Sequence, residues 1–248
     1  MYEKLFHECD RLQEVAHTYK KTCNTIYKDL LNDVVRTEYA RGGETIHRGY
    51  YCPSPVYDII VGRASRGRLL KDMKRIKKNP DYTFGFNANN ELIVIQNSFY
   101  REFIVRDQHT ELSIIFSKYS IEAITECRYV GNQIQSYIYC LFLEGKVDEY
   151  RKEEYSYGDE GLQFVDWYLF IPMRIHIPKK IRELVFDKGE EMPPIYSHEK
   201  YKFTHKDGYL YQYKAIPVDD PLNTSIPPSL DIRPLLDLTF DVRLKRKI

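Results

Sequence analysis

The sequence predicts an α+β protein in which a long N-terminal helix and a second helical region pack on an antiparallel β meander. Apolar residues recur at helical spacing near the N-terminus, the apolar period changes to two residues from Asp81, and short turn signals separate the segments that follow. With 43% hydrophobic and 29% charged residues, the 248-residue chain can bury a sizeable core, which excludes a disordered chain. We expect one globular unit with a helical region (1–80), a meander (81–215) and a proline-rich strap with a last strand (216–248).

The N-terminal helix is predicted from a stripe of apolar or semi-apolar residues. They are Leu5, Cys9, Leu12, Ala16, Tyr19, Cys23, Ile26, Leu30 and Val34. Neither Gly nor Pro interrupts before Gly42, so the pattern predicts a helix of about 35 residues, roughly 50 Å long. A coiled-coil dimer would use such a stripe, but Ala, Cys and Tyr suit that seam poorly. We therefore favour packing on a second helical region, predicted over 54–78 after Ser54-Pro55.

The meander is predicted from segments that alternate or stay apolar. They span 82–86, 91–96, 100–106, 111–118, 121–130, 134–143, 147–157 and 163–171. Short turns between them make neighbouring strands antiparallel. Asp207-Gly208 predicts a further hairpin between 201–204 and 209–215, and a last strand is expected over 238–244. The expected inner-face residues are Leu112, Ile114, Phe116, Val165, Trp167, Leu169 and Ile171.

Charge is balanced overall but unevenly distributed. The 37 basic and 36 acidic residues leave a net charge of +1, with +6 in residues 1–80 and −7 in residues 81–160. No long-range field would therefore draw the whole chain to nucleic acid or to an anionic membrane. The basic stretch 63–78 could contact phosphates, but few aromatic residues lie among its charges. We favour a solvated or docked helix face there and expect no nucleic-acid partner.

The sequence favours a cytoplasmic protein without a membrane segment, because its start lacks the features of a signal peptide and no apolar run approaches 18 residues. Five widely spaced cysteines indicate reduced, mostly buried thiols. The seven histidines are scattered, with only His198 and His205 near each other, and we expect surface or hairpin roles for them. No metal-ligating pattern and no nucleophile motif stands out, so we expect no metal, no cofactor and no catalytic residue.

Two fragments suggest enzymes. Asp81 followed by Glu144-Gly145-Lys146 resembles the carboxylate and lysine pattern of metal-dependent nucleases, although Glu-Gly-Lys also suits a hairpin turn. His47-Arg48-Gly49 resembles a strand motif of ADP-ribosyltransferases, but no Glu-x-Glu loop completes it. The alternative function is accordingly a metal-dependent nuclease or a nucleotide-modifying enzyme.

An acidic, tyrosine-rich segment is the candidate partner-binding surface. The chain has 22 tyrosines, and many lie beside carboxylates in the meander. Tyrosine is favoured at interfaces, and negative charge would attract a basic partner, although tyrosine also suits strands in general. The candidate partner-binding residues are Asp148, Glu149, Tyr150, Glu153, Glu154, Tyr155, Tyr157, Asp159 and Glu160.

Three segments of the meander, residues 82–95, 134–139 and 153–162, carry a family resemblance. Their strand and turn phrases resemble those of immunity proteins encoded beside bacterial polymorphic toxins, over about residues 54–175. The resemblance implies a protein that neutralises a cognate toxin by binding it. The leading hypothesis is therefore a non-enzymatic binding protein whose acidic, tyrosine-rich surface occludes a basic toxin domain such as a nuclease.

Overall fold

The computed structural model describes residues 2–43, 47–56, 66–70, 79–118, 120–172, 194–207 and 209–223. Two compact units make up the chain: Glu14–Tyr137, called here the central unit, and Met1–Gln13 with Ile138–Ile248, called the terminal unit. Most of the predicted second helical region and of the proline-rich strap, and all of the strand predicted over 238–244, lie outside the described residues.

The described residues form a 12-stranded sheet. Its strands are β1 Arg36–Arg41, β2 Arg68–Leu69, β3 Tyr82–Phe86, β4 Leu92–Asn97, β5 Arg101–Arg106, β6 Thr110–Phe116, β7 Ile121–Val130, β8 Gln133–Leu143, β9 Lys146–Gly158, β10 Gly161–Ile171, β11 Ile195–Lys206 and β12 Tyr209–Ile216. From β3 to β12 each strand neighbours the next one in the chain, while β1 lies between β3 and β2. This order confirms the predicted meander.

The predicted single N-terminal helix is wrong. The chain forms α1 (Tyr2–Lys20) and α2 (Cys23–Asn32), and then enters β1. The N–H group of Val35 donates to the carbonyl of Phe86 at 2.9 Å, which begins the pairing of β1 with β3. The helix does not continue because residues 36–40 pair with the edge of β3. The β-branched Val34 and Val35, which precede β1, favour this extended conformation.

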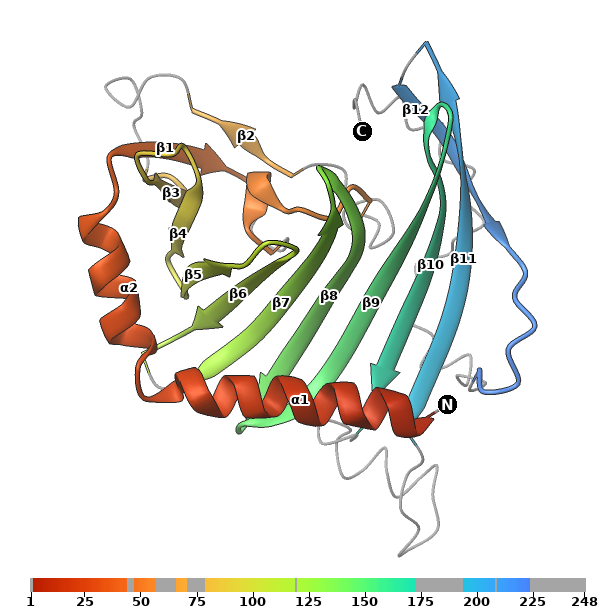
Figure 1. Ribbon diagram of the computed structural model, residues 1–248, viewed down its shortest axis with the longest axis horizontal. Helices are drawn as coiled ribbons and strands as arrows, with labels where there is room; N and C mark the ends of the chain where they lie inside the picture. The colour runs from red at the N-terminus through yellow and green to blue at the C-terminus, as the bar shows by residue number, and fades with distance from the viewer. Residues whose placement is uncertain are drawn as a thin grey trace, which may run out of the picture. The chain divides into compact units, whose positions relative to one another are not determined.

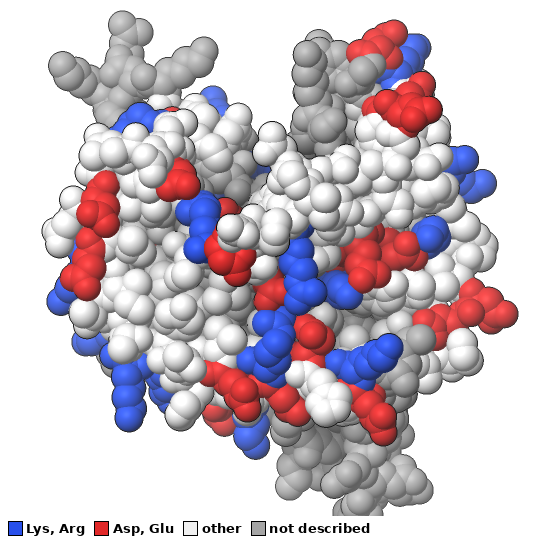
Figure 2. Space-filling model, in the orientation of Figure 1, with Lys and Arg blue, Asp and Glu red and all other residues white. Residues whose placement is uncertain are grey.

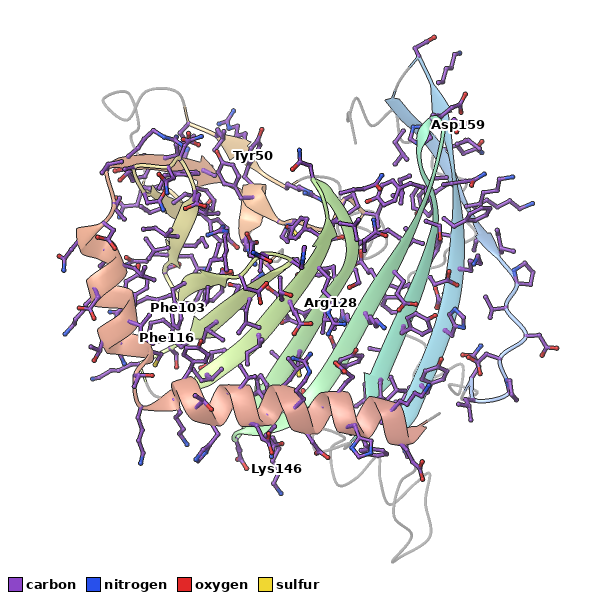
Figure 3. All side chains as sticks on the ribbon, viewed as in Figure 1. Tyr50, Phe103, Phe116, Arg128, Lys146 and Asp159 are labelled. Atoms are coloured by element: carbon purple, nitrogen blue, oxygen red, sulfur yellow. The ribbon has the colours of Figure 1, made fainter. Side chains whose placement is uncertain are left out.

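The apolar stripe of the N-terminal segment is part of the core, and within the described residues it packs on the sheet. Its buried members are Cys9, Leu12, Ala16 and Cys23, and Tyr27, which is not one of the predicted set, is also buried. In the central unit, the ring of Tyr19 meets Phe103 with centroids 5.6 Å apart, and Tyr27 meets Phe116 at 5.7 Å. Figure 3 shows Phe103 and Phe116 next to each other beside α2. The sheet face therefore supplies the apolar partner that the stripe requires.

The opposite face of β5, β6 and β7 in the central unit carries a polar layer. Residues 47–56, with the short helix η1 (Gly49–Tyr51), contact this face through Arg48. The Arg66 guanidinium holds this segment by donating to the carbonyls of Cys52, at 2.5 Å, and Ser54. This layer contains the first candidate site.

The terminal unit contains β9, β10, β11 and β12. Figure 1 shows β9, β10 and β11 side by side. The ring of Phe6 meets Phe170 edge to face with centroids 5.1 Å apart, so the first turns of α1 pack on β10. Strands lie on both sides of the predicted Asp207 turn, where Asp207 has a positive φ of 54°.

The predicted inner-face residues are buried to different degrees. Ile114, Phe116 and Val165 are buried, whereas Leu112, Trp167, Leu169 and Ile171 are partly buried. On β10 the pairing with β9 shifts register between Leu162 and Phe164, which interrupts strict alternation. The predicted burial is therefore complete only for some members of the set.

All five cysteines are buried and free, as predicted from their spacing. Burial, together with the nearby carboxylates of Asp10 and Glu8, raises the pKa of Cys9 to about 12, so this thiol is un-ionised at neutral pH. Neither of the two helices in the described residues is long and apolar enough to cross a membrane.

Candidate functional site

The central unit contains a buried charged network around Arg48, whose side chain is 2% exposed. Its Nε lies 3.2 Å from Glu102 Oε1, and its Nη1 donates to Glu111 Oε1. Its Nη2 donates to Thr125 Oγ1 at 3.4 Å. Glu102 is fully buried and also accepts a hydrogen bond from Ser113. Because an unpaired buried charge is strongly destabilising, each member of this network depends on the others.

A tight backbone turn places Arg48 on the sheet. Arg48 has a left-handed backbone with φ of 58°, and Gly49 follows with φ of 50°. A Cβ atom on Gly49 would lie 3.0 Å from the ring of Tyr82, so this position combines positive φ with a close approach. On the sheet, Arg106 stands opposite Glu111 in the β5–β6 register. Glu111 consequently receives one arginine from the loop and one from the neighbouring strand.

The network combines titratable groups with different protonation preferences. Burial raises the pKa of Glu102 to about 7, against the opposing effects of the Arg48 charge and the Ser113 hydroxyl. Burial and the adjacent Arg48 charge lower the pKa of His47 well below 6.5, which keeps this imidazole neutral. Burial acts to raise the pKa of Glu111, but the two arginines outweigh it and lower that pKa. Glu102 is therefore the member whose charge changes near neutral pH.

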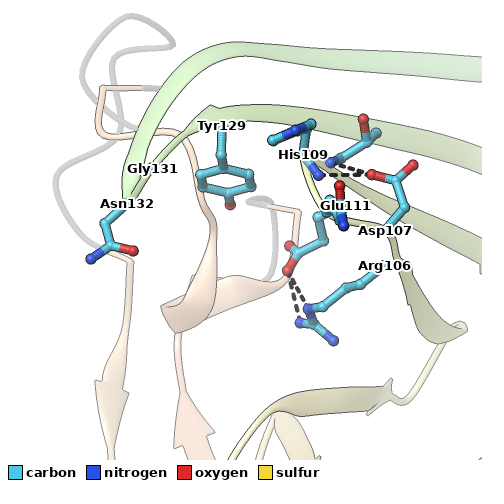
Figure 4. A pocket seen from close by; sticks show the side chains of 9 residues that line it. Arg106, Asp107, His109, Glu111, Tyr129, Gly131 and Asn132 are labelled. Carbon is cyan, nitrogen blue, oxygen red and sulfur yellow. Dashed lines mark hydrogen bonds and ion pairs between the residues drawn. The ribbon is translucent and has the colours of Figure 1, made fainter.

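A pocket of about 290 Å³ opens beside this network, at the β5–β6 and β7–β8 turns (Figure 4). Its lining residues are Arg106, Asp107, Gln108, His109, Thr110, Glu111, Tyr129, Gly131 and Asn132. Arg106 donates from Nε and pairs through Nη2 with Glu111 Oε2, both at 2.8 Å. The Asp107 carboxylate accepts the backbone N–H groups of His109 and Thr110, which lowers its pKa.

The geometry of this pocket limits what Glu111 can do. Both of its carboxylate oxygens accept from arginines, one from Arg48 and the other from Arg106. These two arginines outweigh the effect of burial and lower the pKa of Glu111, which makes this carboxylate a weak proton acceptor at neutral pH. The arrangement instead connects the loop containing Arg48 to the sheet and to the rim of the pocket.

The second candidate site lies on one face of β9, β10 and β11 in the terminal unit. Glu154 stands directly opposite Asp166, and Asp166 stands opposite Lys200 on the next strand. Lys200 Nζ donates to Asp166 Oδ2 at 2.8 Å, and Lys152 Nζ lies 2.6 Å from Glu154 Oε1. The Tyr168 hydroxyl donates to Glu154 Oε2 at 3.4 Å. Each of the two carboxylates, which lie on adjacent strands, is thus paired with a different lysine.

His198 extends this face. The sequence predicts a surface or hairpin role for this histidine, but it lies within β11 between two carboxylates. Its Nε2 is 3.0 Å from Asp166 Oδ1, and its Nδ1 is 3.3 Å from Asp220 Oδ2. Its ring stacks on Tyr168 with centroids 4.4 Å apart. Figure 2 shows acidic and basic side chains interspersed over this part of the molecule.

The nine predicted partner-binding residues do not share one exposed face. Those on β9 point alternately to its two sides, so Glu154 and Tyr155 face opposite ways. Tyr150, Glu153 and Tyr155 are at most 5% exposed. Glu149 pairs with Arg151, and Asp148 and Tyr157 are partly buried. The prediction of a single exposed surface formed by all nine is therefore wrong, because successive side chains of a strand point to opposite faces of the sheet. Glu154 is partly exposed, and Asp159 and Glu160 are exposed at the β9–β10 turn, where Figure 3 labels Asp159.

The fragments that resembled enzymes have structural positions. Glu144 and Gly145, with φ of 52° and 78°, form the hairpin turn between β8 and β9. The Asp81 carboxylate accepts the N–H group of Gly42 at 2.7 Å. Both residues belong to the central unit, whereas Glu144 belongs to the terminal unit. His47 precedes η1 and does not lie in a strand. Within the part of the chain that the structure describes, no group of three or more His, Cys, Asp or Glu residues could hold a metal ion.

Sequence reasoning did not find the network around Arg48. One available signal was Glu102, a carboxylate inside the apolar run of a predicted strand. The partner of Glu102 cannot be read from neighbouring positions, because Arg48 lies in a loop much earlier in the chain. The family models, the curated proteins and the solved structures that were compared with this chain yielded no match.

Proposed function

We propose that this chain is a non-enzymatic binding protein of the immunity type, which neutralises a cognate toxin by occluding it. The observation that carries the proposal is the cross-strand pair of carboxylates, Glu154 and Asp166. Like charges directly opposite each other on adjacent strands destabilise a sheet unless cations offset them. The side chain of Glu154 is 47% exposed, so a cation from a partner could reach it. Lys152 and Lys200 each pair with one of these carboxylates, and a cation from a basic partner would add a further ion pair at the exposed Glu154.

The chemistry beside Glu154 suits arginine and lysine side chains. A guanidinium can bind a carboxylate with two parallel hydrogen bonds and stack on an aromatic ring such as that of Tyr168. The exposed Asp159 and Glu160 add negative charge at the turn of the same hairpin. This distribution would raise the association rate with a positively charged domain. The resemblance of three meander segments to immunity proteins supports a toxin as that partner.

The proposal is tested with the toxin encoded beside the gene. The purified proteins are mixed, and both complex formation and toxin activity are measured. We expect a complex at micromolar concentration or below together with loss of toxin activity. Absence of a complex at micromolar concentration, with toxin activity undiminished, would refute the proposed function.

The assigned face is tested by reversing one charge. Glu154→Lys should slow association by about tenfold at low salt, because it replaces an attraction with a repulsion. Glu144→Lys is the matched control, since Glu144 is exposed at the turn that begins β9. Equal association rates for the two variants would place the interface away from Glu154, even if the complex itself forms.

A further inference from the structure

We propose that His198 is a pH-dependent latch that holds residues 217–223 against β11. The ladder between β11 and β12 ends where Lys200 pairs with Ile216, so the backbone of His198 lies beyond it. The chain then passes through residues 217–219 and turns at Asp220. The closed latch is the conformation in the structure.

The segment docks on the backbone of β11 through one amide side chain. Asn223 Oδ1 accepts the N–H group of His198 at 2.7 Å, and Asn223 Nδ2 donates to the His198 carbonyl at 3.4 Å. Asp220 shapes the turn, because its Oδ1 accepts the N–H group of Leu222 and its carbonyl accepts that of Asn223, both at 3.0 Å. The side-chain amide of Asn223 thus makes the two hydrogen bonds to the His198 backbone that a neighbouring strand would otherwise make.

The contacts of the His198 imidazole with two carboxylates add to this docking. Nε2 of His198 faces Asp166 and Nδ1 faces Asp220. A neutral imidazole carries one N–H group, so one of the two carboxylates would face a lone pair. The imidazolium donates from both nitrogens and satisfies both carboxylates. Closure around Asp220 therefore favours the doubly protonated ring.

The groups around the ring stabilise its positive charge. From β10 come Asp166 and the stacked Tyr168, whose hydroxyl contacts Glu154 of β9. From β11, Lys200 binds the far oxygen of Asp166, and Tyr196 donates to Asp220 Oδ2 at 3.0 Å. Lys152, also from β9, pairs with Glu154. Two carboxylates thus contact the ring directly, while Lys200 is engaged with one of them.

The segment contributes Asp220, which stays charged in the relevant pH range. Burial acts to raise the pKa of Asp220, but hydrogen bonds from Leu222, Tyr196 and His198 outweigh it and lower that pKa. Imidazoles change charge between about pH 5 and 8, where a carboxylate of this kind remains ionised. The latch should therefore be closed at pH 5.5 and loosened at pH 8.5.

Hydrogen exchange of the free full-length chain tests the latch. Exchange rates at both pH values are converted to protection factors, which removes the intrinsic effect of pH. The amides of His198, Leu222 and Asn223 should lose about tenfold of their protection between pH 5.5 and pH 8.5, as expected for losing one hydrogen bond to a charged group. His198→Asn should abolish this difference. His205→Asn is the matched control and should retain it, because His205 lies on the same strand and contacts the Leu162 carbonyl at 2.8 Å.

Either of two exchange results would overturn the latch: equal protection at both pH values in the natural chain, or an unchanged pH difference in His198→Asn. Nitrogen-15 shifts of the His198 ring in the natural chain give a measurement that needs no variant. They should show both nitrogens protonated at pH 5.5, and a neutral ring beside protected Leu222 and Asn223 amides would also contradict the latch. The test needs no partner, so its failure leaves toxin binding unaffected.

Discussion

Replacing Arg48 with methionine removes a buried cation while keeping a side chain of similar length. The variant leaves Glu102 without its ion pair and Glu111 without one of its two arginines. Glu102 can take up a proton at modest cost, because burial already raises its pKa to about 7. Glu111 keeps Arg106, yet its side chain is only 13% exposed. We expect Arg48→Met to lower the free energy of unfolding by about 3 kcal/mol, at the lower end for breaking a buried pair.

Arg106→Met supplies a comparison on the same carboxylate. Arg106 contacts Glu111 at 2.8 Å through two nitrogens, but its side chain is 29% exposed whereas that of Arg48 is 2% exposed. Water screens this partly exposed pair, so its loss should cost about 1 kcal/mol or less. The two variants therefore differ mainly in the burial of the arginine that they remove.

Urea unfolding at pH 7, followed by circular dichroism, measures both losses. The midpoint should fall much further for Arg48→Met than for Arg106→Met, with an unchanged dependence on urea concentration in each. A double-mutant cycle with Glu111→Gln should give a coupling energy for Arg48 of about 1.5 kcal/mol or more. Similar losses of unfolding free energy in the two arginine variants would show that burial does not make the Arg48 ion pair more stabilising than the Arg106 pair.

Three further predictions concern stability. In the folded chain the pKa of Glu102 is raised from 4.5 to about 7, so its contribution to stability is fully present below about pH 4.5 and is lost as the pH rises to about 7. The free energy of unfolding, measured with urea at pH 5 and pH 8, should fall less between these pH values in Glu102→Gln than in the natural chain. An equal fall in the two proteins would contradict this prediction. Phe170→Ala should cost ~3–5 kcal/mol in urea unfolding, because Phe170 is fully buried against Phe6, and a loss under ~1 kcal/mol would count against that packing. Gly85→Ala should lower the free energy of unfolding by ~1–3 kcal/mol, since its Cβ would lie 2.6 Å from Val94 Cγ2, and unchanged thermal unfolding would show that the strands can separate there.

The meander was predictable because its signals are local. Alternating apolar residues define each strand, and turn residues such as those at Gly131 and Asp207 define where the chain reverses. Short connections then leave only antiparallel neighbours. The observed order from β3 to β12 follows from these two features.

The end of the N-terminal helix was not predictable from its own pattern. The apolar spacing continues to Val34 without a Gly or Pro, so nothing in the segment marks Asn32 as the end of α2. The edge of β3, more than 45 residues later in the chain, supplies the backbone partners that turn residues 36–41 into a strand. Tertiary pairing therefore overrode the local helical period.

The sequence by itself determined which segments of the meander are strands and in what order they pair, because alternation and turn chemistry act between near neighbours. Only the tertiary structure decided which side chains share a face. Arg48 meets Glu111 across 63 positions, and His198 meets Asp166 across 32. Such pairs depend on strand register and on the side to which each residue points, and both are set by the packing of distant segments.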